Sequence, residues 1–200
     1  MIEVTKELIA IVMAAVLVNN YVLAQFLGIC PFLGVSKKLD AAVGMSAAVI
    51  FVMLMATAAT WPIYHYILDP MELGYMQTVI FILVIAALVQ LVEMVLKKFV
   101  PPLYRSLGVF LPLITTNCAI LGVVVLNITK TYTFSQSMVN SLGAGLGYLL
   151  AMVLFSGVRS RVDTADVPEC FKGIPITLVA ASIMSVSFMG FTGMVENMFK

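Results

Sequence analysis

The sequence has very little charge. Asp, Glu, Lys and Arg together make up 10% of its 200 residues, whereas hydrophobic residues make up 62%. Soluble domains are about a quarter charged and roughly half apolar, and the mean hydropathy here is +1.10. This composition excludes a soluble globular protein and predicts an integral membrane protein that lies in the lipid bilayer. The net charge of +1 gives no indication of nucleic-acid binding.

Two common motifs are also missing. The chain has no Cys-x-x-Cys pair and no Gly-x-x-x-x-Gly-Lys phosphate loop, so it lacks the usual signatures of a redox dithiol and of a bound nucleoside triphosphate. Gly143, Gly145 and Gly147 superficially suggest a nucleotide-binding loop. They follow no predicted strand and lie in the middle of an apolar stretch, which favours close helix packing instead.

Six stretches contain no Asp, Glu, Lys or Arg, and each reaches the ~20 residues that a helix needs to cross ~30 Å of hydrocarbon. They are residues 8–36, 41–68, 73–92, 106–129, 131–158 and 173–195. We therefore predict an all-α integral membrane protein with six transmembrane helices in a single membrane domain, 1–200. The first stretch follows charged residues and lacks a small-residue cleavage site, so we expect it to remain in the mature chain.

The positive charges are divided unequally between the two sides of the predicted spans. Three, Lys6, Lys130 and Lys200, lie on one side. Eight lie on the other, namely Lys37, Lys38, Lys97, Lys98, Arg105, Arg159, Arg161 and Lys172. Positive residues are retained on the cytoplasmic side. The eight-charge side is therefore predicted to be cytoplasmic, which places both termini on the outer face of the cytoplasmic membrane.

One short frame occurs twice. "CPFLGV" at residues 30–35 and "CAILGV" at residues 118–123 share the pattern Cys-x-x-Leu-Gly-Val. Each copy lies in the first span of a three-span half. Because three is odd, the second half enters the membrane in the opposite direction, which predicts two inverted repeats, approximately 1–98 and 99–200. Proteins with such repeats commonly place their functional centre where two broken helices meet.

Both copies of the frame are predicted to lie at broken helices, in spans 1 and 4. As one helix, residues 8–36 would measure roughly 43 Å at ~1.5 Å per residue, which is too long for a straight crossing. Gly28 and Pro31 flank Cys30. Proline suits the first position of a helix, so we expect a new helix to begin at Pro31 with Cys30 at its cap.

The second break is predicted from polar residues. Pro112 and the run Thr115, Thr116 and Asn117 precede Cys118. Such side chains can cap a half-helix or satisfy freed backbone groups. Each cysteine would then face the positive end of a short helix, an environment that stabilises a thiolate over a thiol.

Several roles are open to these two cysteines. A single membrane cysteine is usually a small apolar residue in the packing, and a disulfide between the pair would not explain the polar breaks. An iron–sulfur cluster would, because it needs thiolates and N–H donors to its sulfurs. We expect such donors from Phe32, Leu33 and the residues after Cys118. A [2Fe–2S] cluster takes four ligands, so a second, similar chain would have to supply two. Cys170 has no repeat partner and is taken as incidental.

Four segments carry a resemblance to a known family. They are "LVNNYVLAQFLGICPFLGVSKK" (17–38), "FLPLITTNCAILGV" (110–123), "ADVPECFKG" (165–173) and "FMGFTG" (188–193). They closely resemble the RnfA/RnfE and NqrD/NqrE family of membrane subunits, over essentially the whole chain. Asn19, Asn20 and Pro31 resemble the Rnf type more than the Nqr type.

The resemblance implies a six-helix protein that pairs with a homologous RnfE-like subunit of opposite topology. In that family, cysteines matching Cys30 and Cys118 combine with two from the partner to hold a [2Fe–2S] cluster inside the membrane. The complex, with its other Rnf subunits, couples electron transfer between ferredoxin and NAD to sodium or proton movement. The Ser-Gly-Ala-Thr motif that carries covalent flavin in companion subunits is absent, so no flavin is expected on this chain. A secondary transporter and an NqrE-type subunit remain alternatives.

A few polar residues lie within the predicted spans. Glu93 could serve an ion path, although a pair with Lys97 at i, i+4 is the simpler interpretation. Asn19 and Asn20 could also belong to such a path, but interhelical hydrogen bonds are the default role of intramembrane amides. Asn117, next to a proposed ligand, is the residue most expected to support the cluster.

Overall fold

The computed structural model describes residues 2–36, 39–71, 74–99 and 111–198, and this part of the chain is helical without any strand. The α-helices are α1 (Ile2–Met13), α2 (Ile29–Val35), α3 (Leu39–Ile63), α4 (Gln77–Phe99), α6 (Leu111–Thr115), α7 (Cys118–Thr129), α8 (Phe134–Val162) and α9 (Ile174–Met198). Two π-helical turns, η1 (Ala14–Val18) and η2 (Tyr64–Leu68), extend α1 and α3, and two short 3₁₀ turns, η3 (Gly74–Met76) and η4 (Glu169–Phe171), precede α4 and α9. The all-α prediction is confirmed for these residues.

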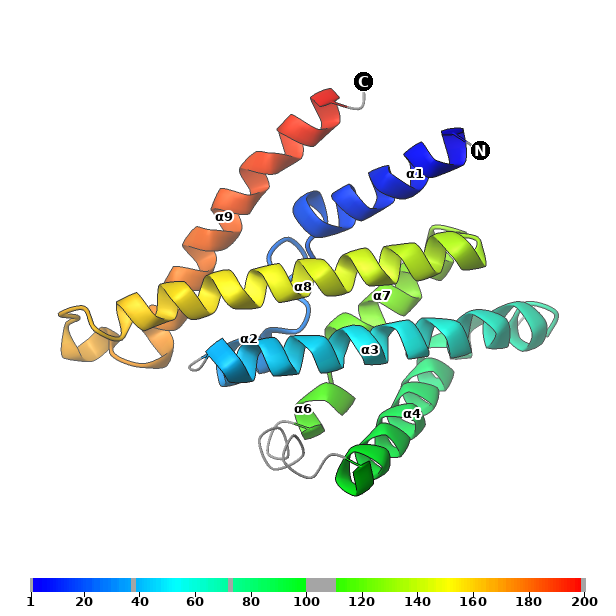
Figure 1. Ribbon diagram of the computed structural model, residues 1–200, viewed down its shortest axis with the longest axis horizontal. Coiled ribbons are helices and arrows are strands. Elements are labelled where there is room, and N and C mark those ends of the chain that lie inside the picture. The colour runs from blue at the N-terminus through cyan, green and yellow to red at the C-terminus, as the bar shows by residue number, and fades with distance from the viewer. Residues whose placement is uncertain (1, 37–38, 72–73, 100–110, 199–200) are drawn as a thin grey trace.

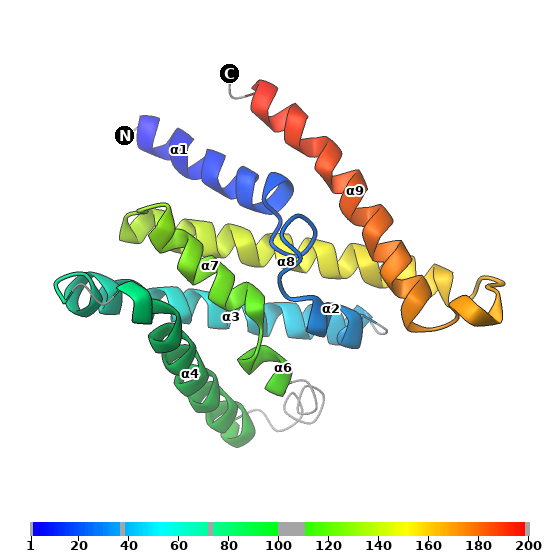
Figure 2. The same ribbon diagram turned by 180° about the vertical axis from the view of Figure 1, so that it is seen from behind.

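Helices α3 and α8 form the centre of the molecule and run antiparallel, side by side (Figure 1). Helices α1 and α9 lie on one side of this pair and α4 on the other, and the same arrangement is seen from behind (Figure 2). The short helix α2 and the longer α7 lie in front of the pair in that second view, and α6 lies beyond α3 on the side of α4. The core is formed where these elements meet, and its largest buried side chains include Tyr148, Phe155 and Met45.

The glycines of α8 permit close packing. A Cβ atom at Gly145 would lie 2.7 Å from Cγ1 of Ile50 in α3, and one at Gly147 would lie 3.1 Å from the carbonyl oxygen of Ala15 in η1. A larger residue at Gly145 would force Ile50 to shift, and one at Gly147 would require the backbone of η1 to give by a few tenths of an ångström. The interpretation of this glycine run as a helix-packing surface is therefore confirmed.

Among the described residues, three helices are long and apolar enough to cross a membrane: Leu39–Leu68, Gly74–Val95 and Phe134–Val162. They correspond to predicted spans 41–68, 73–92 and 131–158. The other three predicted spans contain shorter apolar helices, Leu8–Val18, Leu113–Thr129 and Ile174–Gly190. The membrane assignment is thus supported, while six full crossings stay a prediction. Part of the fourth predicted span, at 106–110, lies outside the described residues.

The order of elements is the same in the two parts of the chain. An interrupted helix (α1 and η1, then α2) is followed by α3 and α4, and a second interrupted helix (α6, then α7) is followed by α8 and α9. The pieces differ in length, since α2 has 7 residues and α7 has 12. Both predicted interruptions are observed.

Candidate metal-ligand site at two interrupted helices

The first interruption is a loop, 19–28, that Asn20 holds in place. Asn20 is fully buried; its Nδ2 donates to the carbonyl oxygen of Gly147 in α8 at 2.9 Å. Its Oδ1 accepts from the backbone N–H groups of Val22 at 3.1 Å and Leu23 at 3.3 Å. The side chain therefore satisfies backbone groups that the broken helix leaves free, which gives Asn20 a structural role in this loop.

Gly28 ends the loop and caps α2. Its φ of +81° lies in the left-handed region, which glycine adopts without strain. The helix begins at Ile29, so Cys30 is its second residue and Pro31 its third. The prediction that Pro31 begins this helix, with Cys30 at the cap, is therefore wrong. The physical reason is that left-handed Gly28 itself reverses the chain and allows the helix to begin earlier.

The second interruption lies between α6 and α7, and Asn117 caps α7. The Oδ1 of Asn117 accepts a hydrogen bond from the backbone N–H of Ala119 at 3.0 Å, and Cys118 is the first residue of α7. This is the usual role of asparagine at a helix N-terminus, and the capping prediction is confirmed. Asn117 is 4% exposed, and its buried Nδ2 has no hydrogen-bond partner among the described residues.

The two interruptions touch each other. The backbone N–H of Gly28 donates to Sγ of Cys118 at 3.0 Å. A Cβ atom at Gly28 would lie 3.0 Å from Oδ1 of Asn117, 3.1 Å from Cβ of Ala119 and 3.2 Å from Cε2 of Tyr148. Only glycine therefore fits here without displacing a neighbour. The sequence argument identified Gly28 as a helix breaker but did not predict that it donates to a cysteine sulfur.

Cys30 and Cys118 are both exposed on the surface of the chain, and both are free thiols, as is Cys170. Within the described ranges, no group of three or more His, Cys, Asp and Glu side chains could hold a metal ion. A metal centre at either cysteine would therefore need further ligands from outside the described residues.

The helix that carries Cys30 is fixed to α8 at two points. At the first point, the ring of Phe32 stacks on Phe155 with centroids 4.1 Å apart. Within α2 itself, the backbone N–H of Phe32 donates to the carbonyl oxygen of Gly28 at 3.3 Å. Arg159, only 9% exposed, donates from one terminal nitrogen to the carbonyl oxygen of Leu33 and to Oγ of Ser36. The guanidinium thus binds the carboxyl end of α2, where cations are favoured.

Sequence reasoning missed Arg159, which it counted only as a cytoplasmic charge. Its buried Nε has no partner among the described residues. The available signal was its position in the sequence. Arg159 directly follows the charge-free stretch 131–158, so its long side chain can reach back into the protein.

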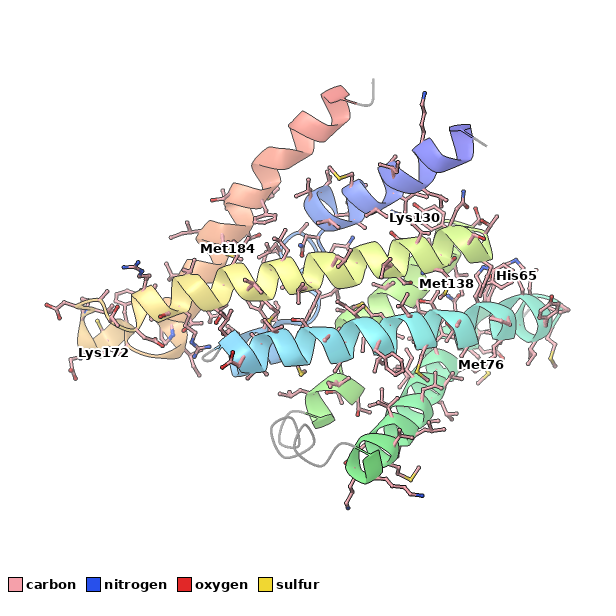
Figure 3. The ribbon with its side chains drawn as sticks, viewed as in Figure 1. His65, Met76, Lys130, Met138, Lys172 and Met184 are labelled. Carbon is pink, nitrogen blue, oxygen red and sulfur yellow. The ribbon has the colours of Figure 1, made fainter. Side chains whose placement is uncertain are left out.

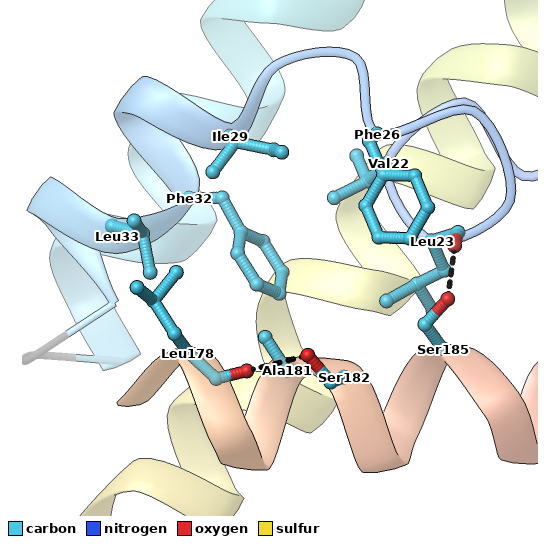
Figure 4. Close-up of a pocket in the computed structure, with 10 residues that line it drawn as sticks. All are labelled: Val22, Leu23, Phe26, Ile29, Phe32, Leu33, Leu178, Ala181, Ser182 and Ser185. Carbon is cyan, nitrogen blue, oxygen red and sulfur yellow. Dashed lines mark hydrogen bonds between the residues drawn. The ribbon is translucent and has the colours of Figure 1, made fainter. Parts of the chain in front are cut away.

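Beside the first loop, a small apolar cavity of about 70 Å³ separates α9 from α2 (Figure 4). Oγ of Ser185 in α9 donates to the carbonyl oxygen of Leu23 at 2.6 Å and ties the loop to α9. Phe26 lines the cavity, is 57% exposed and has a φ of +56°. Positive φ is uncommon for such a bulky residue, so this loop is held by its tertiary contacts.

The remaining predicted site residues lie elsewhere. Glu93 lies in α4 with a partly buried side chain. Asn19 ends η1, where its N–H donates to the carbonyl oxygen of Ala14 at 2.7 Å, and its side chain lines a separate cavity. Neither residue takes part in the contacts between the two interruptions that are described above.

These features define a helical membrane protein in which two interrupted helices meet at a cysteine sulfur. A family model for the Rnf-Nqr subunit, described as a membrane protein, matches residues 8–195. The chain therefore belongs to the Rnf-Nqr family of membrane subunits.

Three relatives illustrate the similarity. The chain is 57% identical over 187 residues to a subunit of the Na⁺-translocating ferredoxin:NAD⁺ oxidoreductase complex of Acetobacterium woodii, covering 94% of this chain and 97% of that protein. It is 55% identical to a subunit of an ion-translocating oxidoreductase complex of Syntrophotalea carbinolica, covering 96% and 100%. The corresponding Vibrio vulnificus protein is 51% identical, with 95% and 99% covered.

Proposed function

We propose that this chain is an electron-carrying membrane subunit of an ion-translocating ferredoxin:NAD oxidoreductase complex of the Rnf type. In this proposal, Cys30 and Cys118 each supply one thiolate to a [2Fe–2S] cluster shared with a homologous, RnfE-like subunit. The relatives named above are subunits of ion-translocating oxidoreductase complexes, which favours the Rnf type over a secondary transporter and over an NqrE-type subunit.

The single observation that carries the proposal is the hydrogen bond from the Gly28 N–H to Sγ of Cys118. A backbone N–H aimed at a cysteine sulfur is the kind of donor that surrounds iron-bound cysteine ligands. Hydrogen bonds to sulfur also tune iron–sulfur centres. The contact brings the loop before Cys30 against Cys118, so both twinned cysteines belong to one region of the fold.

The number and exposure of the thiols support a shared site. Two cysteines supply half of the four ligands that a [2Fe–2S] cluster takes, and both lie on the surface of the isolated chain. An ionic centre facing hydrocarbon would be strongly unfavourable. A second protein chain that covers this surface would complete the ligand set and exclude lipid.

The chain's own residues would hold the two ligands in fixed positions. Asn117 caps the helix that begins at Cys118, while Phe155 and Arg159 bind the helix that carries Cys30. Such support limits how far each sulfur can move. When bound, the cluster would supply one-electron transfer inside the membrane.

The proposal includes six crossings in two inverted halves, with both termini outside. The repeated order of elements supports this arrangement. So does the separation of charge, because Lys172 lies at one end of the molecule and Lys130 at the other (Figure 3). Of the other charges used for the orientation, Lys37, Lys38, Arg105 and Lys200 lie outside the described residues.

The test is to express the chain with its RnfE-like neighbour and to compare Cys30→Ser, Cys118→Ser and Cys170→Ser. Serine replaces a soft thiolate with a poor ligand for iron. The unaltered pair should be coloured, should be bleached by dithionite and should contain about two irons, the content of one shared cluster. Cys30→Ser and Cys118→Ser should each lose the iron and the EPR signal of the reduced pair.

Cys170→Ser is the matched control, because Cys170 lies in η4 and is not part of either interrupted helix. It should keep full iron and full signal. Full iron in either of the other two variants would show that the cysteine concerned only packs. A colourless pair that binds a small solute would favour a transporter instead.

A further inference from the structure

A second polar site lies at the end of the molecule that carries Lys130 (Figure 3). It is a cavity of about 270 Å³, which we call the Asn140 cavity. Small apolar residues of α1 and η1 form one wall. Its polar lining consists of Asn19, Tyr21, Lys130, Tyr132 and Asn140. Because water occupies roughly 30 Å³ per molecule in the liquid, a polar cavity of this size holds several waters.

Two amide oxygens of the cavity accept no hydrogen bond from the described residues. Asn140 is 4% exposed, and its Nδ2 donates both to Oδ1 of Asn127 at 2.6 Å and to the hydroxyl of Tyr21 at 3.3 Å. Both amide hydrogens are therefore used, and no described residue donates to Oδ1 of Asn140. The side chain of Asn19 likewise makes no hydrogen bond within the described part of the chain. These two amide oxygens are acceptors available to a ligand.

A chain of neutral polar groups continues from the cavity into the protein. Nδ2 of Asn127 donates to Oγ of Ser141 at 3.1 Å, and Ser141 shares a hydrogen bond of 2.6 Å with the hydroxyl of Thr57 in α3. All three side chains are at most 2% exposed. Interhelical hydrogen bonding accounts for these contacts. It does not account for the open cavity or for the free oxygens of Asn140 and Asn19.

The lining atoms favour one class of ligand. Among the described lining residues there is no Asp, Glu or His, so the carboxylates that Ca²⁺ and Mg²⁺ prefer are absent, as is a group that binds a proton near neutral pH. Neutral amide and phenolic oxygens suit a hard monovalent cation that keeps part of its water. We propose that the Asn140 cavity is a weak binding site for Na⁺ on the ion path.

This inference rests on the proposed function, since it assigns this chain a part of the ion path. Lys130 fits a weak site. Its amine lies 5.8 Å from the centre of the Tyr132 ring, and its charge lowers the affinity for a cation at the cavity. Low affinity is what an ion needs in order to leave a site quickly.

The test measures Na⁺ binding to the purified full chain in detergent, without redox chemistry. Thermal unfolding is followed while NaCl replaces N-methyl-D-glucamine chloride at constant ionic strength, because a ligand that binds the folded state raises the melting temperature. Asn19→Leu removes one oxygen without breaking a hydrogen bond of the described network. It should weaken the apparent Na⁺ affinity about tenfold. Lys130→Gln should strengthen it about two- to fivefold.

Thr129→Val is the matched control. Thr129 lies at the same end of the molecule, but it is exposed and its hydroxyl bonds to the carbonyl oxygen of Val125. This variant should keep the Na⁺ response unchanged. If NaCl gives the unaltered chain no stabilisation beyond that of the replacement salt, or if Asn19→Leu responds like Thr129→Val, the site does not exist.

Failure of the site and failure of the proposed function give different results. The Cys30→Ser chain should keep its Na⁺ response while its complex with the neighbouring subunit loses iron. A normal iron content with no Na⁺ response would therefore overturn the Asn140 site alone.

Discussion

Replacing Gly28 with alanine tests the contact between the two interrupted helices. Two costs add at this position. An L-residue in the left-handed region costs about 1–2 kcal/mol, and the new Cβ would press on Asn117, Ala119 and Tyr148 at 3.0–3.2 Å. Forcing an extra methyl into a packed interior costs about 1–3 kcal/mol. Gly28→Ala should therefore lower the free energy of unfolding by about 2–5 kcal/mol.

Two other glycines separate these costs. Gly173 has a φ of +93° but open space around its Cβ position, so Gly173→Ala should cost only the backbone strain of about 1–2 kcal/mol. Gly157 lies in α8 without positive φ and also has open space. Gly157→Ala should be neutral or should stabilise by up to about 1 kcal/mol, the helix preference of alanine over glycine.

The assay is unfolding of the purified chain in mixed micelles with increasing SDS, followed by tryptophan fluorescence. Trp61 is the single tryptophan; it stacks on His65 and donates to the carbonyl oxygen of Tyr132, so its signal depends on native packing. If Gly28→Ala is no less stable than Gly173→Ala, the close contact between Gly28 and the second interruption is absent, and the reasoning about the site fails with it.

Two further predictions concern α8 and the orientation. Arg159→Gln should destabilise the chain by about 1–3 kcal/mol in the same assay, because it removes charged donors from Leu33 and Ser36. Arg159→Lys should recover part of this loss. If Arg159→Gln leaves the free energy of unfolding unchanged, α2 is held by the Phe32–Phe155 stack alone. A reporter active only in the cytoplasm should be active when inserted at Asp166 and silent when fused after Lys200, and the opposite pattern would reverse the predicted topology.

The interruptions of the two helices could be predicted because their causes are local. Gly28, Pro31 and the polar run before Cys118 break or cap a helix wherever they occur. The predicted beginning of α2, at Pro31, was too late. The sequence pattern does not indicate whether Gly28 or Pro31 sets the start of the helix. Gly28 acts here because its conformation is fixed by contacts with residues that follow it by about ninety positions, as its hydrogen bond to Cys118 requires.

Other parts of the site depend on packing between distant segments, which hydrophobic periodicity does not encode. Arg159 was predicted to mark the cytoplasmic face, yet it reaches into the protein and binds α2. Asn20 was considered for an ion path, but Gly147 accepts from its amide and so makes it a support for the loop. Asn19, its neighbour, makes no side-chain hydrogen bond with a described residue and lines a cavity. Which of two adjacent asparagines is available is decided by the helix that packs against them.

Helix α8 is one continuous helix that carries groups of both proposed sites. Its carboxyl-terminal half holds α2 through Phe155 and Arg159, and its amino-terminal half contributes Asn140 to the cavity. Asn140 and Arg159 are separated by roughly 28 Å along the helix axis at ~1.5 Å per residue. A tilt of this one helix would move the support of Cys30 and the lining of the cavity together. In the proposed function, this helix would link electron movement and ion movement mechanically without any additional element.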